Sequence, residues 1–456
     1  MKVSKLSFNW LRRAVGKPCV FTFDGGIHPG DMKERTSGKA IVDISAPQML
    51  VFPLSQHIGA PAKPCVEVGD RVLVGQKIAE ADGFVSANIH SSVSGTVVAI
   101  EPRLHPLGTS VMSVVVENDG LNECSCDMKK HSMDEVDSKD IVNIVREAGI
   151  VGMGGAAFPT HIKLTPSEDS PIKYVIVNGA ECEPYLTSDH REMVEDPQEI
   201  IDGLKLTMKV FGLNEGYIAI ETNKPDAIKI MSDFAKRETE VKINVVAVKT
   251  KYPQGSEKHL IKAVTGQTVP AGKLPKDVGA VVNNIDSCAA IARAVLKGVP
   301  LTKRIVTVSG DCIAEPQNLR VPIGTSFEHL VEVCGGLTKT AAKVIMGGPM
   351  MGIAMSSLAV PVIKGSSGLL IFSEEMIPSV EEGFCLRCGK CVSGCPMNLL
   401  PNALKESVLQ GDTERLEKLN ILSCIQCGSC TYVCPAEQNP LRYIRTGKMK
   451  LREAKK

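Results

Sequence analysis

The feature that most constrains this chain is a pair of identical cysteine runs near its C-terminus. The pattern Cys-x2-Cys-x2-Cys-x3-Cys-Pro occurs at residues 385–396 and again at 424–435, and it uses eight of the 16 cysteines. Three thiolates at this spacing on a tight loop can each reach a different iron of one four-iron cube, and the fourth iron needs a ligand from elsewhere. Zinc sites instead use two Cys-x-x-Cys pairs joined by a spacer. The runs therefore predict two [4Fe–4S] clusters.

The ligands of the two predicted clusters are expected to be crossed. In two-cluster ferredoxins with this spacing, the fourth cysteine of each run ligates the cluster of the other run. The first cluster is expected to use Cys385, Cys388, Cys391 and Cys434. The second is expected to use Cys424, Cys427, Cys430 and Cys395. Between the runs, residues 399–422 contain apolar residues at helical spacing, which favours a helical insert over a compact βαβ ferredoxin.

Composition limits the partners and the location of the chain. A net charge of +1 and an aromatic content of 4% argue against a nucleic-acid partner. No stretch approaches the roughly 18 continuous apolar residues of a membrane-spanning helix, and residues 1–13 lack the apolar core of a signal peptide. We therefore expect a cytosolic chain, or one held at a membrane by a partner, in which clustered cysteines bind metal instead of forming disulfides.

The length of 456 residues and the changing pattern along the chain predict a multidomain α/β protein. Short apolar runs between Gly and Pro predict a β unit in the N-terminal domain, residues 1–118, whose two halves resemble the barrel-sandwich hybrid of biotinyl and lipoyl carriers. No lysine occurs between Lys77 and Lys129, so no covalent prosthetic group is expected. The other predicted units are a linker at 119–140, an α/β flavin- and NADH-binding domain at 141–300, a module resembling the β-grasp ligand-binding type at 301–365, and a helical two-cluster ferredoxin domain at 366–456.

A glycine-rich loop opens the predicted α/β domain. The stretch Gly149-Ile-Val-Gly-Met-Gly-Gly155 exposes backbone N–H groups, and Lys163 adds positive charge further along the chain, as a phosphate cradle requires. A helical pattern at 140–148 precedes the loop, whereas a dinucleotide-binding fingerprint follows a strand. Taken alone, the loop is either a phosphate site or a simple turn.

The loop and three later stretches resemble the flavin domain of the NADH-oxidising subunit of respiratory complex I. Asn178-Gly-Ala-Glu-Cys-Glu-Pro184, Tyr252-Pro-Gln-Gly-Ser-Glu-Lys258 and Val282-Asn-Asn-Ile-Asp286 occur in the order of that family's motifs. The resemblance implies non-covalent FMN, surrounded by Gly152, Gly154, Gly155, Lys163, Asn178, Glu181, Asn283 and Asn284. It also implies a site for NADH or NAD+ as substrate at Phe158, Glu183 and Glu257.

Three positions depart from that family's pattern. Ala157 replaces a glycine, Ala180 replaces an aspartate that would bond to the flavin ring, and Ser256 replaces a glutamate. The resemblance therefore implies an intact phosphate cradle with fewer contacts to the flavin ring.

Two N-terminal stretches extend the resemblance over most of the chain. Thr22-Phe-Asp-Gly-Gly-Ile-His-Pro29 and Pro53-Leu-Ser-Gln-His-Ile-Gly-Ala-Pro-Ala62, together with the motifs above, resemble the RnfC family of Rnf-type complexes. This resemblance implies a peripheral subunit on the cytoplasmic face of the cell membrane that passes electrons between NADH, FMN and the two clusters. It implies a place in an ion-translocating ferredoxin:NAD+ oxidoreductase, with integral-membrane and ferredoxin-like subunits as neighbours and ferredoxin as the redox partner. The coupling ion and the direction of electron flow stay open.

Two alternative functions remain. Cobalamin reductases of microcompartments combine a similar flavin loop with similar cysteine runs, but they carry the barrel at the other end of the chain. The second alternative is a scaffold subunit with structural clusters and an inactive nucleotide site, to which the changes at Ala180 and Ser256 point. NADH-driven reduction of a dye by the isolated chain separates the scaffold from both enzymes.

Overall fold

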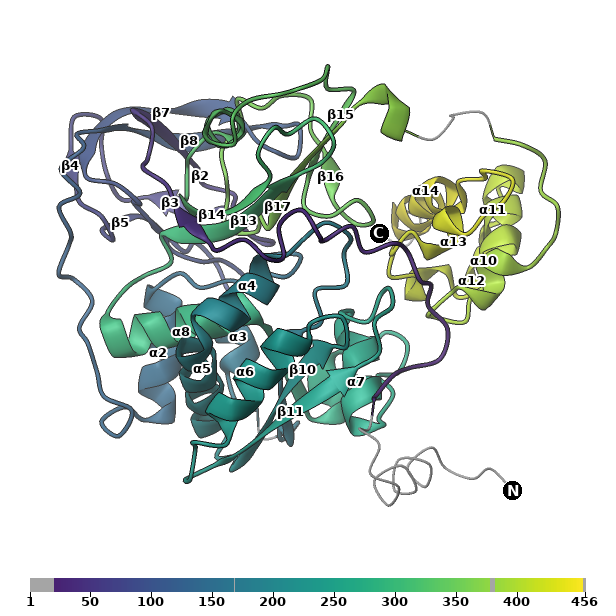
Figure 1. Cartoon of the computed structure of the whole chain (residues 1–456), viewed down its shortest axis with the longest axis horizontal. Coiled ribbons are helices and arrows are strands. Elements are labelled where there is room, and N and C mark those ends of the chain that lie inside the picture. Colours follow the sequence, from purple (N-terminus) through teal and green to yellow (C-terminus); the bar gives the residue numbers. More distant parts are fainter. Residues whose placement is uncertain (1–19, 168, 378–381, 454–456) are drawn as a thin grey trace.

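The computed structural model describes residues 20–167, 169–377 and 382–453. Figure 1 shows a β barrel-sandwich, an α/β domain, a mixed sheet with one flanking helix, and a helical C-terminal domain. The predicted fold class, a multidomain α/β protein made of these kinds of unit, is confirmed. Within the described ranges, no helix is both long enough and apolar enough to cross a membrane.

The barrel-sandwich consists of two antiparallel sheets, with strand orders β2-β8-β7-β4 and β3-β5-β6. Leu50 and Phe52 of β2 and Val114 and Val116 of β8 are fully buried, because side chains on one face of each strand point into the barrel. The strands are β2 (Met49–Pro53), β3 (Lys63–Pro64), β4 (Arg71–Val72), β5 (Lys77–Glu80), β6 (Ile89–His90), β7 (Gly95–Leu104) and β8 (Ser110–Asn118).

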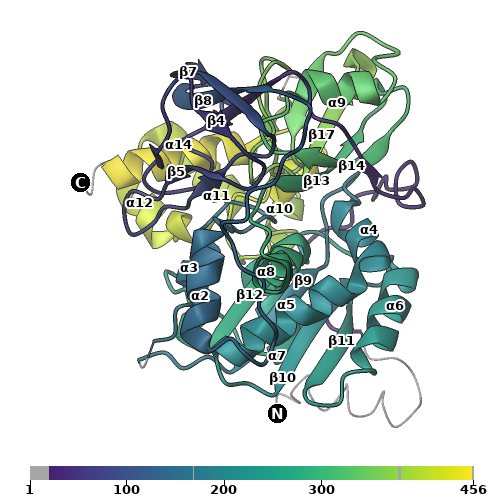
Figure 2. The ribbon, with the colours of Figure 1, turned by 90° about the vertical axis from the view of Figure 1, so that its left-hand side faces the viewer.

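The α/β domain is built on a parallel sheet of order β11-β10-β9-β12. Its strands are apolar runs because helices cover both faces, with α4, α5, α6 and α8 on one face (Figure 2) and α7 on the other. The strands are β9 (Tyr174–Gly179), β10 (Glu215–Glu221), β11 (Lys242–Val248) and β12 (Ala280–Asn284). The helices are α2 (Ser138–Glu147), α3 (Thr160–Leu164), α4 (Ser188–Glu195), α5 (Pro197–Val210), α6 (Pro225–Ala235), α7 (Glu257–Thr265), the 3-10 helix η1 (Pro275–Val278) and α8 (Ile285–Lys297).

The chain order of these strands creates a switch point. From β9 the chain moves to β10 and then β11 on one side, while β12 pairs with β9 on its other side. In open parallel sheets, ligands bind in the crevice outside the carboxyl ends of the strands at such a point. The crevice between the ends of β9 and β12 is therefore where a ligand is expected.

A six-stranded mixed sheet of order β1-β14-β13-β17-β15-β16 forms the third part. It includes residues on both sides of the predicted 301–365 module. Strand β1 comes from the predicted N-terminal domain, and β17 lies beyond residue 365. Both strands pair with strands inside the predicted module, so the sheet extends past the module on both sides. The elements are β1 (Val42–Asp43), β13 (Lys303–Ser309), β14 (Gln317–Pro322), α9 (Phe327–Val333), β15 (Lys343–Met346), β16 (Ile353–Ala354), β17 (Gly368–Phe372) and the 3-10 helix η2 (Glu374–Met376).

The C-terminal domain is helical, with α11 and α12 between the two cysteine runs, as the sequence predicts. Helix α14 packs against α11 so closely that a Cβ at Gly447 would lie 2.5 Å from Cγ2 of Val408. Leu404, Leu416 and Ile444 form the centre of its core. The elements are α10 (Lys390–Ser393), α11 (Pro401–Gln410), α12 (Thr413–Lys418), the 3-10 helix η3 (Ile421–Ser423), α13 (Ser429–Tyr432) and α14 (Pro440–Glu453).

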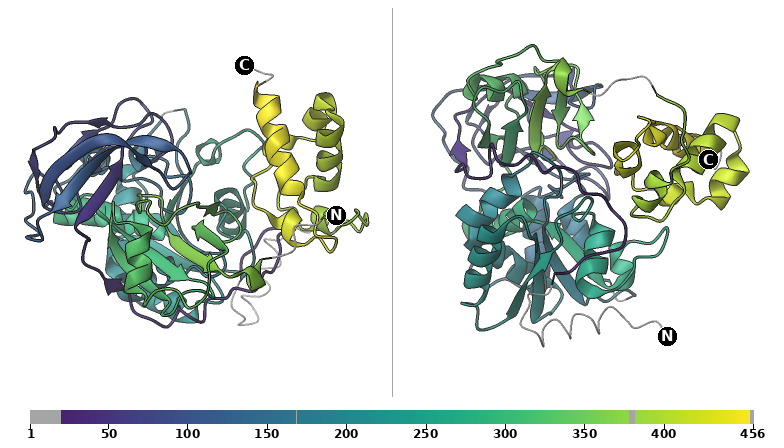
Figure 3. Two further views of the ribbon diagram at one scale, coloured as in Figure 1. Left: turned by 90° about the horizontal axis from the view of Figure 1, so that it is seen from above. Right: turned by 45° about the vertical axis from the view of Figure 1, so that its right-hand side comes forward.

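The N-terminal segment from residue 20 connects distant parts of the molecule. It runs from the edge of the parallel sheet past the C-terminal domain and on to the mixed sheet (Figures 1 and 3). Phe21 pairs with Val248 at the end of β11, and Ile27 pairs with Tyr252. At Gly25, which has a φ of +80°, a Cβ would lie 3.1 Å from the carbonyl oxygen of Cys395. The segment therefore contacts both the α/β domain and the first cysteine run.

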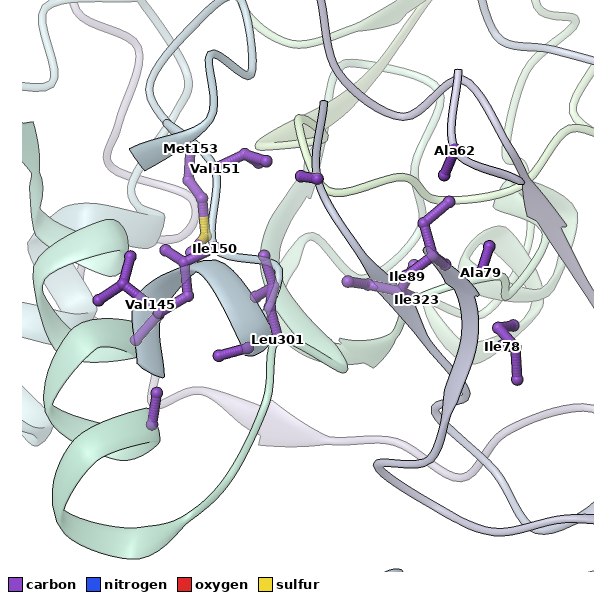
Figure 4. Packing of buried hydrophobic residues seen from close by; sticks show 14 of the residues in the cluster. Ala62, Ile78, Ala79, Ile89, Val145, Ile150, Val151, Met153, Leu301 and Ile323 are labelled. Carbon is purple, nitrogen blue, oxygen red and sulfur yellow. The ribbon is translucent and has the colours of Figure 1, made fainter. Parts of the chain in front are cut away.

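One continuous apolar core joins the barrel to the glycine loop. Figure 4 shows Ile78 and Ile89 of the barrel on one side and Ile150 and Met153 of the loop on the other, with Leu301 close to Ile150. These side chains are fully or almost fully buried. The barrel thus supports the loop directly and shares its core.

Candidate functional site

The predicted flavin residues gather at the switch point of the parallel sheet. Asn178 at the end of β9 lies in register with Asn284 at the end of β12. The glycine loop is beside them, because a Cβ at Gly154 would lie 3.1 Å from Cβ of Asn284. Lys163 of α3 reaches the same edge, where its Nζ donates to the carbonyl oxygen of Val282 at 3.2 Å. We call this region the flavin crevice.

The glycine loop is held in place from three sides. The N–H of Gly152 donates to the carbonyl oxygen of Phe158 at 2.8 Å. The N–H of Met153 donates to Oγ of Ser287 on α8 at 2.9 Å, and Nη2 of Arg304 on β13 donates to the Met153 carbonyl oxygen at 3.2 Å. Next to these fixed residues, nothing lies within 4 Å of a Cβ placed on Gly155. The loop therefore has a supported base and an open side at Gly155.

Lys163 and Glu257 meet across the crevice. Their Nζ and Oε1 atoms are 3.3 Å apart, and both side chains are partly exposed. The sequence assigns Lys163 to a flavin phosphate and Glu257 to a nucleotide, so the structure brings the two predicted subsites together. Such a half-exposed pair contributes little to stability, and an anion can take the place of Glu257 beside Lys163.

Two amides in this region are buried without partners. Asn283 is 3% exposed and Gln254 is fully buried. In the part of the chain that the structure describes, the side-chain atoms Nδ2 of Asn283 and Nε2 and Oε1 of Gln254 make no hydrogen bond. Unsatisfied buried polar groups are costly, and each commonly marks a missing ligand, ion or water. Two of the motifs that the sequence assigns to the flavin and nucleotide therefore carry unused hydrogen-bonding capacity, which fits a polar group such as FMN.

The two remaining predicted asparagines already have partners. Asn178 donates from Nδ2 to the carbonyl oxygen of Gly255 at 2.8 Å. Asn284 caps α8, since its Oδ1 accepts the N–H groups of Asp286 and Ser287, and its Nδ2 donates to Asp189 at 2.7 Å. Both residues shape the crevice by fixing the segments around it.

The two acidic residues of the 178–184 motif also bind the protein itself. Glu181 accepts the N–H groups of Asp189 and His190 at 2.7 and 3.3 Å, so its carboxylate occupies the N-terminus of α4. Glu183 accepts the N–H groups of Met350 and Met351 at 3.0 and 2.9 Å. Burial raises the pKa of Glu183 to about 7. Glu183 thus ties the flavin crevice to the 348–351 loop of the mixed sheet.

The eight cysteines of the two runs line two separate hollows. Each hollow takes three cysteines from one run and the fourth from the other. The buried hollow is lined by Cys395, Cys424, Cys427 and Cys430. The exposed hollow is lined by Cys385, Cys388, Cys391 and Cys434. Within the described residues, no three Cys, His or carboxylate groups come together in a way that could hold one metal ion.

The buried hollow lies against the flavin crevice. The hydroxyl of Tyr252 donates to the carbonyl oxygen of Cys427 at 2.8 Å, and Nε2 of His259 is 3.0 Å from that of Pro396. Cys182 belongs to the same small apolar cluster as Tyr252 and Cys427, and its Sγ accepts the N–H of Gly255 at 3.3 Å. Residues 252–259 therefore connect the two sites.

The exposed hollow opens toward solvent. Cys385 and Cys388 are exposed, whereas Cys395, Cys427 and Cys430 of the other hollow are buried. Phe384, which is 95% exposed, flanks the first cysteine of the run. The two hollows thus share a cysteine spacing and differ in their access to water.

Family models match four consecutive parts of the chain. They are the RnfC barrel sandwich hybrid domain at residues 21–121, the Nuo51 FMN-binding domain at 145–293, the SLBB domain at 305–354 and the 4Fe-4S dicluster domain at 382–438. These matches support FMN and iron–sulfur clusters as the cofactors.

Known RnfC-type proteins are similar over nearly the whole chain. The relative from the proton-translocating ferredoxin:NAD(+) oxidoreductase complex of Clostridium ljungdahlii is 46% identical over 95% of this chain and 94% of its own length. The relative from the Na(+)-translocating ferredoxin:NAD(+) oxidoreductase complex of Acetobacterium woodii is 44% identical over 94% of this chain and 97% of its own. The relative from the ion-translocating oxidoreductase complex of Rhodobacter capsulatus is 41% identical, over 88% of this chain and 78% of its own length.

The chain belongs to the RnfC family.

In this RnfC chain, the structure accommodates the three departures from the complex I pattern. Ala157 has a φ of +51°, a left-handed conformation that favours glycine, and its Cβ would lie 3.5 Å from a Cβ placed on Gly365. The carbonyl oxygen of Ala180 accepts Nζ of the buried Lys224 at 2.7 Å. Ser256 Oγ lies 2.9 Å from Nδ1 of His259. None of these three contacts blocks the open side of the loop at Gly155.

Sequence reasoning missed several residues that shape the RnfC site. The buried Lys33 donates from Nζ to the carbonyl oxygen of Glu183 at 2.9 Å, and Arg304 binds both Asp286 and the glycine loop. Lys448 of α14 donates to the carbonyl oxygen of Cys424 at 2.6 Å. These residues lie outside every recognised motif, and a single basic residue in an amphipathic pattern gives no signal that it is buried.

Proposed function

We propose that this chain exchanges electrons with NADH or NAD+ at the flavin crevice and with a protein partner at the exposed hollow. The relatives are named as subunits of ferredoxin:NAD(+) oxidoreductase complexes, two of them ion-translocating by name for protons or Na+. The chain is then a peripheral subunit on the cytoplasmic face of the cell membrane. Its neighbours are integral-membrane and ferredoxin-like subunits, and ferredoxin is the redox partner of the complex.

One observation carries this proposal: a single loop touches both the flavin crevice and the buried hollow. Residues 252–257 supply Tyr252 to the Cys427 carbonyl oxygen, Gly255 to Asn178, and Glu257 to Lys163. The buried hollow is therefore the part of the C-terminal domain next to the nucleotide side, and the exposed hollow is the part open to a partner. This order supports a relay more strongly than a scaffold, which needs no contact between the two sites.

The residues of the crevice have separate tasks in the proposal. The open side of the loop at Gly155 and the ammonium of Lys163 hold the FMN phosphate, with Gly152 and Gly154 shaping the loop. Asn283, Asn178 and Asn284 line the strand ends, where the unpaired Nδ2 of Asn283 is free to donate to the flavin. Bound FMN supplies the exchange between two-electron hydride chemistry and one-electron transfer. Phe158, Glu183 and Glu257 are assigned to the nucleotide, and Glu181 supports the flavin side through α4.

The cysteine ligands are proposed to be crossed between the runs. Cys385, Cys388, Cys391 and Cys434 hold one [4Fe–4S] cluster, and Cys424, Cys427, Cys430 and Cys395 hold the other. The grouping of the thiols in two hollows supports this assignment. The protein adds N–H groups directed at sulfur, from Leu399 to Cys395 at 3.3 Å and from Gln426 to Cys424 at 3.4 Å. Such hydrogen bonds to cysteine sulfur tune cluster potentials.

A flavin titration tests the crevice. Lys163→Ala removes a charge-assisted hydrogen bond worth about 1.5–3 kcal/mol, so FMN binding should weaken by roughly 10- to 150-fold. Both iron–sulfur signals should stay intact. Lys276→Ala, which changes an exposed lysine of the same domain, is the matched control. Unchanged FMN affinity in Lys163→Ala would mean that the glycine loop is only a turn, and the proposed entry point would be lost.

A second variant addresses the nucleotide. Glu183→Gln should slow NADH oxidation while FMN remains bound, measured as NADH-dependent dye reduction beside the flavin titration. If FMN affinity falls instead, the role of Glu183 lies in holding the crevice and not in contacting the nucleotide.

A further inference from the structure

The side chain of Lys448 lies on the inner face of α14, and the residue is only 6% exposed. Its Nζ donates to the carbonyl oxygen of Cys424 at 2.6 Å. No carboxylate forms an ion pair with it in the described ranges of the chain, and the ionisable groups that influence it are Cys424 and the cationic Arg452. Lys448 is therefore a buried cation without an anionic side chain as its partner.

The position of Lys448 is fixed by tight helix packing. Its neighbour Gly447 lies against Val408, Ile421 and Leu416, where an added Cβ would come within 2.9 Å of two of these side chains. Ile444 and Leu451, on the same side of α14, belong to the core of the domain. The ammonium group is therefore held where it is by the packing of the whole helix.

A buried charge without a counter-charge is costly, and natural proteins pair it with a charge of opposite sign. The buried hollow beside Lys448 supplies that charge when it holds a cluster. An iron–sulfur cube with four thiolate ligands is an anion, and reduction adds one more negative charge. Arg445 of α14 also acts on the Cys424 thiol, but its side chain is exposed to solvent.

The exposed hollow has no equivalent residue in the part of the chain that the structure describes. Arg387 lines it from an exposed loop, and Lys390 is also exposed. Lys405, on the nearby α11, is already paired with Glu382. Solvent can stabilise the reduced state of the exposed cluster, whereas burial disfavours the additional charge on the other.

We propose that Lys448 is the positioning residue that sets the reduction potential of the buried cluster, raising it toward that of the exposed cluster. This inference rests on the proposed ligand set of the buried hollow. The fixed positive charge stabilises the reduced state in a site where three of the four cysteines are buried. Lys448 thereby keeps the two clusters close enough in potential for electrons to pass between them in either direction.

The test is a redox titration of the full-length chain, purified without oxygen and followed by EPR. In Lys448→Met the midpoint of one cluster should move to a more negative potential, so that its ratio of reduced to oxidised form at the original midpoint falls about tenfold, or about 59 mV for one electron. The midpoint of the second cluster should not move. Lys448→Arg should titrate like the unmodified chain, because the charge is retained. Lys450→Met, which removes an exposed lysine from the same helix, is the matched control.

Measuring iron content, and adding a second neutral variant, separates a shifted potential from simple loss of a cluster. Lys448→Gln retains a donor for the Cys424 carbonyl oxygen and loses the charge. If Lys448→Met loses iron, the midpoint potentials of Lys448→Gln test the inference in its place. Unshifted midpoints in a neutral variant with full iron content would overturn the inference while leaving the proposed function intact. A shift in the cluster that is lost in Cys391→Ala would instead contradict the ligand assignment on which the inference rests.

Discussion

The two cysteine hollows have the same ligand spacing and different surroundings. Cys395, Cys427 and Cys430 of the buried hollow are shielded from water, and residues from the α/β domain and α14 contact its loops. The exposed hollow has two exposed cysteines and the solvent-facing Phe384. Spacing therefore predicts which atoms bind iron, while we propose that residues outside the motif decide how each cluster is tuned and what it can reach.

The largest expected effects separate the two hollows by their ligands. Cys391→Ala and Cys434→Ala should each lose the signal of the same cluster, and Cys395→Ala should lose the other, because each hollow takes its fourth cysteine from the opposite run. EPR spectra of the three reduced variants, with iron analysis, make the comparison. Loss of the same signal in the Cys391 and Cys395 variants would show that the ligands are not crossed.

A smaller difference is expected in how fast added reagents reach and destroy each of the two clusters. An iron chelator added with a mild oxidant should remove the exposed cluster several times faster than the buried one, because two of its ligands face solvent. The readout is the decay of each EPR signal in time-resolved samples, assigned with the cysteine variants. Equal rates of loss would contradict the difference in accessibility.

The pH dependence of stability tests the contact between Glu183 and the 348–351 loop, which also lies against the buried hollow. Glu183 binds Met350 and Met351, and the Met350 carbonyl oxygen lies 3.3 Å from a Cβ placed on Gly428 of the second run. Its pKa of about 7 is raised above the ordinary 4.5 by burial, so the folded protein holds this proton more tightly than the unfolded chain. The contribution of Glu183 is then fully present below pH 4.5 and is lost as the pH rises toward 7, by at most about 3 kcal/mol.

Melting temperatures of the unmodified chain and Glu183→Gln, measured from pH 4.5 to 7.5, isolate this contribution. The unmodified chain should lose more stability than the variant as the pH rises through this window. Parallel curves would mean that Glu183 is ionised in both the folded and unfolded states.

The smallest expected effect comes from the contact between the two domains. Tyr252→Phe removes one buried hydroxyl that donates to the Cys427 carbonyl oxygen, a loss of about 1 kcal/mol. The expected result is a modest fall in melting temperature and a slower exchange of electrons between nucleotide and clusters, with both clusters present. Tyr432→Phe, at an exposed tyrosine on the other side of this contact, in the C-terminal domain, is the control. Equal melting temperatures and equal rates of electron exchange in the two variants would show that the Tyr252 hydroxyl does not couple the two domains.

The sequence predicted best what depends on short-range spacing. The cysteine runs indicated the clusters, and the glycine loop with its three companion stretches indicated a flavin domain, since each motif carries its own geometry. What could not be predicted depends on contacts between distant segments. Strand β1 joins a sheet whose other strands begin at residue 303, and Lys448 is buried on a helix whose Gly447 packs against α11. The roles of Glu181 as a helix cap and Glu183 as a loop anchor likewise depend on residues outside their motif.

We propose that electrons pass from the exposed hollow to the flavin crevice, or back, through the buried hollow. The most direct measurement reduces the FMN-loaded chain fully, removes the reductant, adds NAD+ without oxygen and follows reoxidation of each cluster by EPR of frozen samples. In Cys388→Ala, which lacks the exposed cluster, the buried cluster should reoxidise as in the unmodified chain. In Cys427→Ala, which lacks the buried cluster, the exposed cluster should stay reduced over the same time. Reoxidation of the exposed cluster at the unmodified rate in Cys427→Ala would contradict the account.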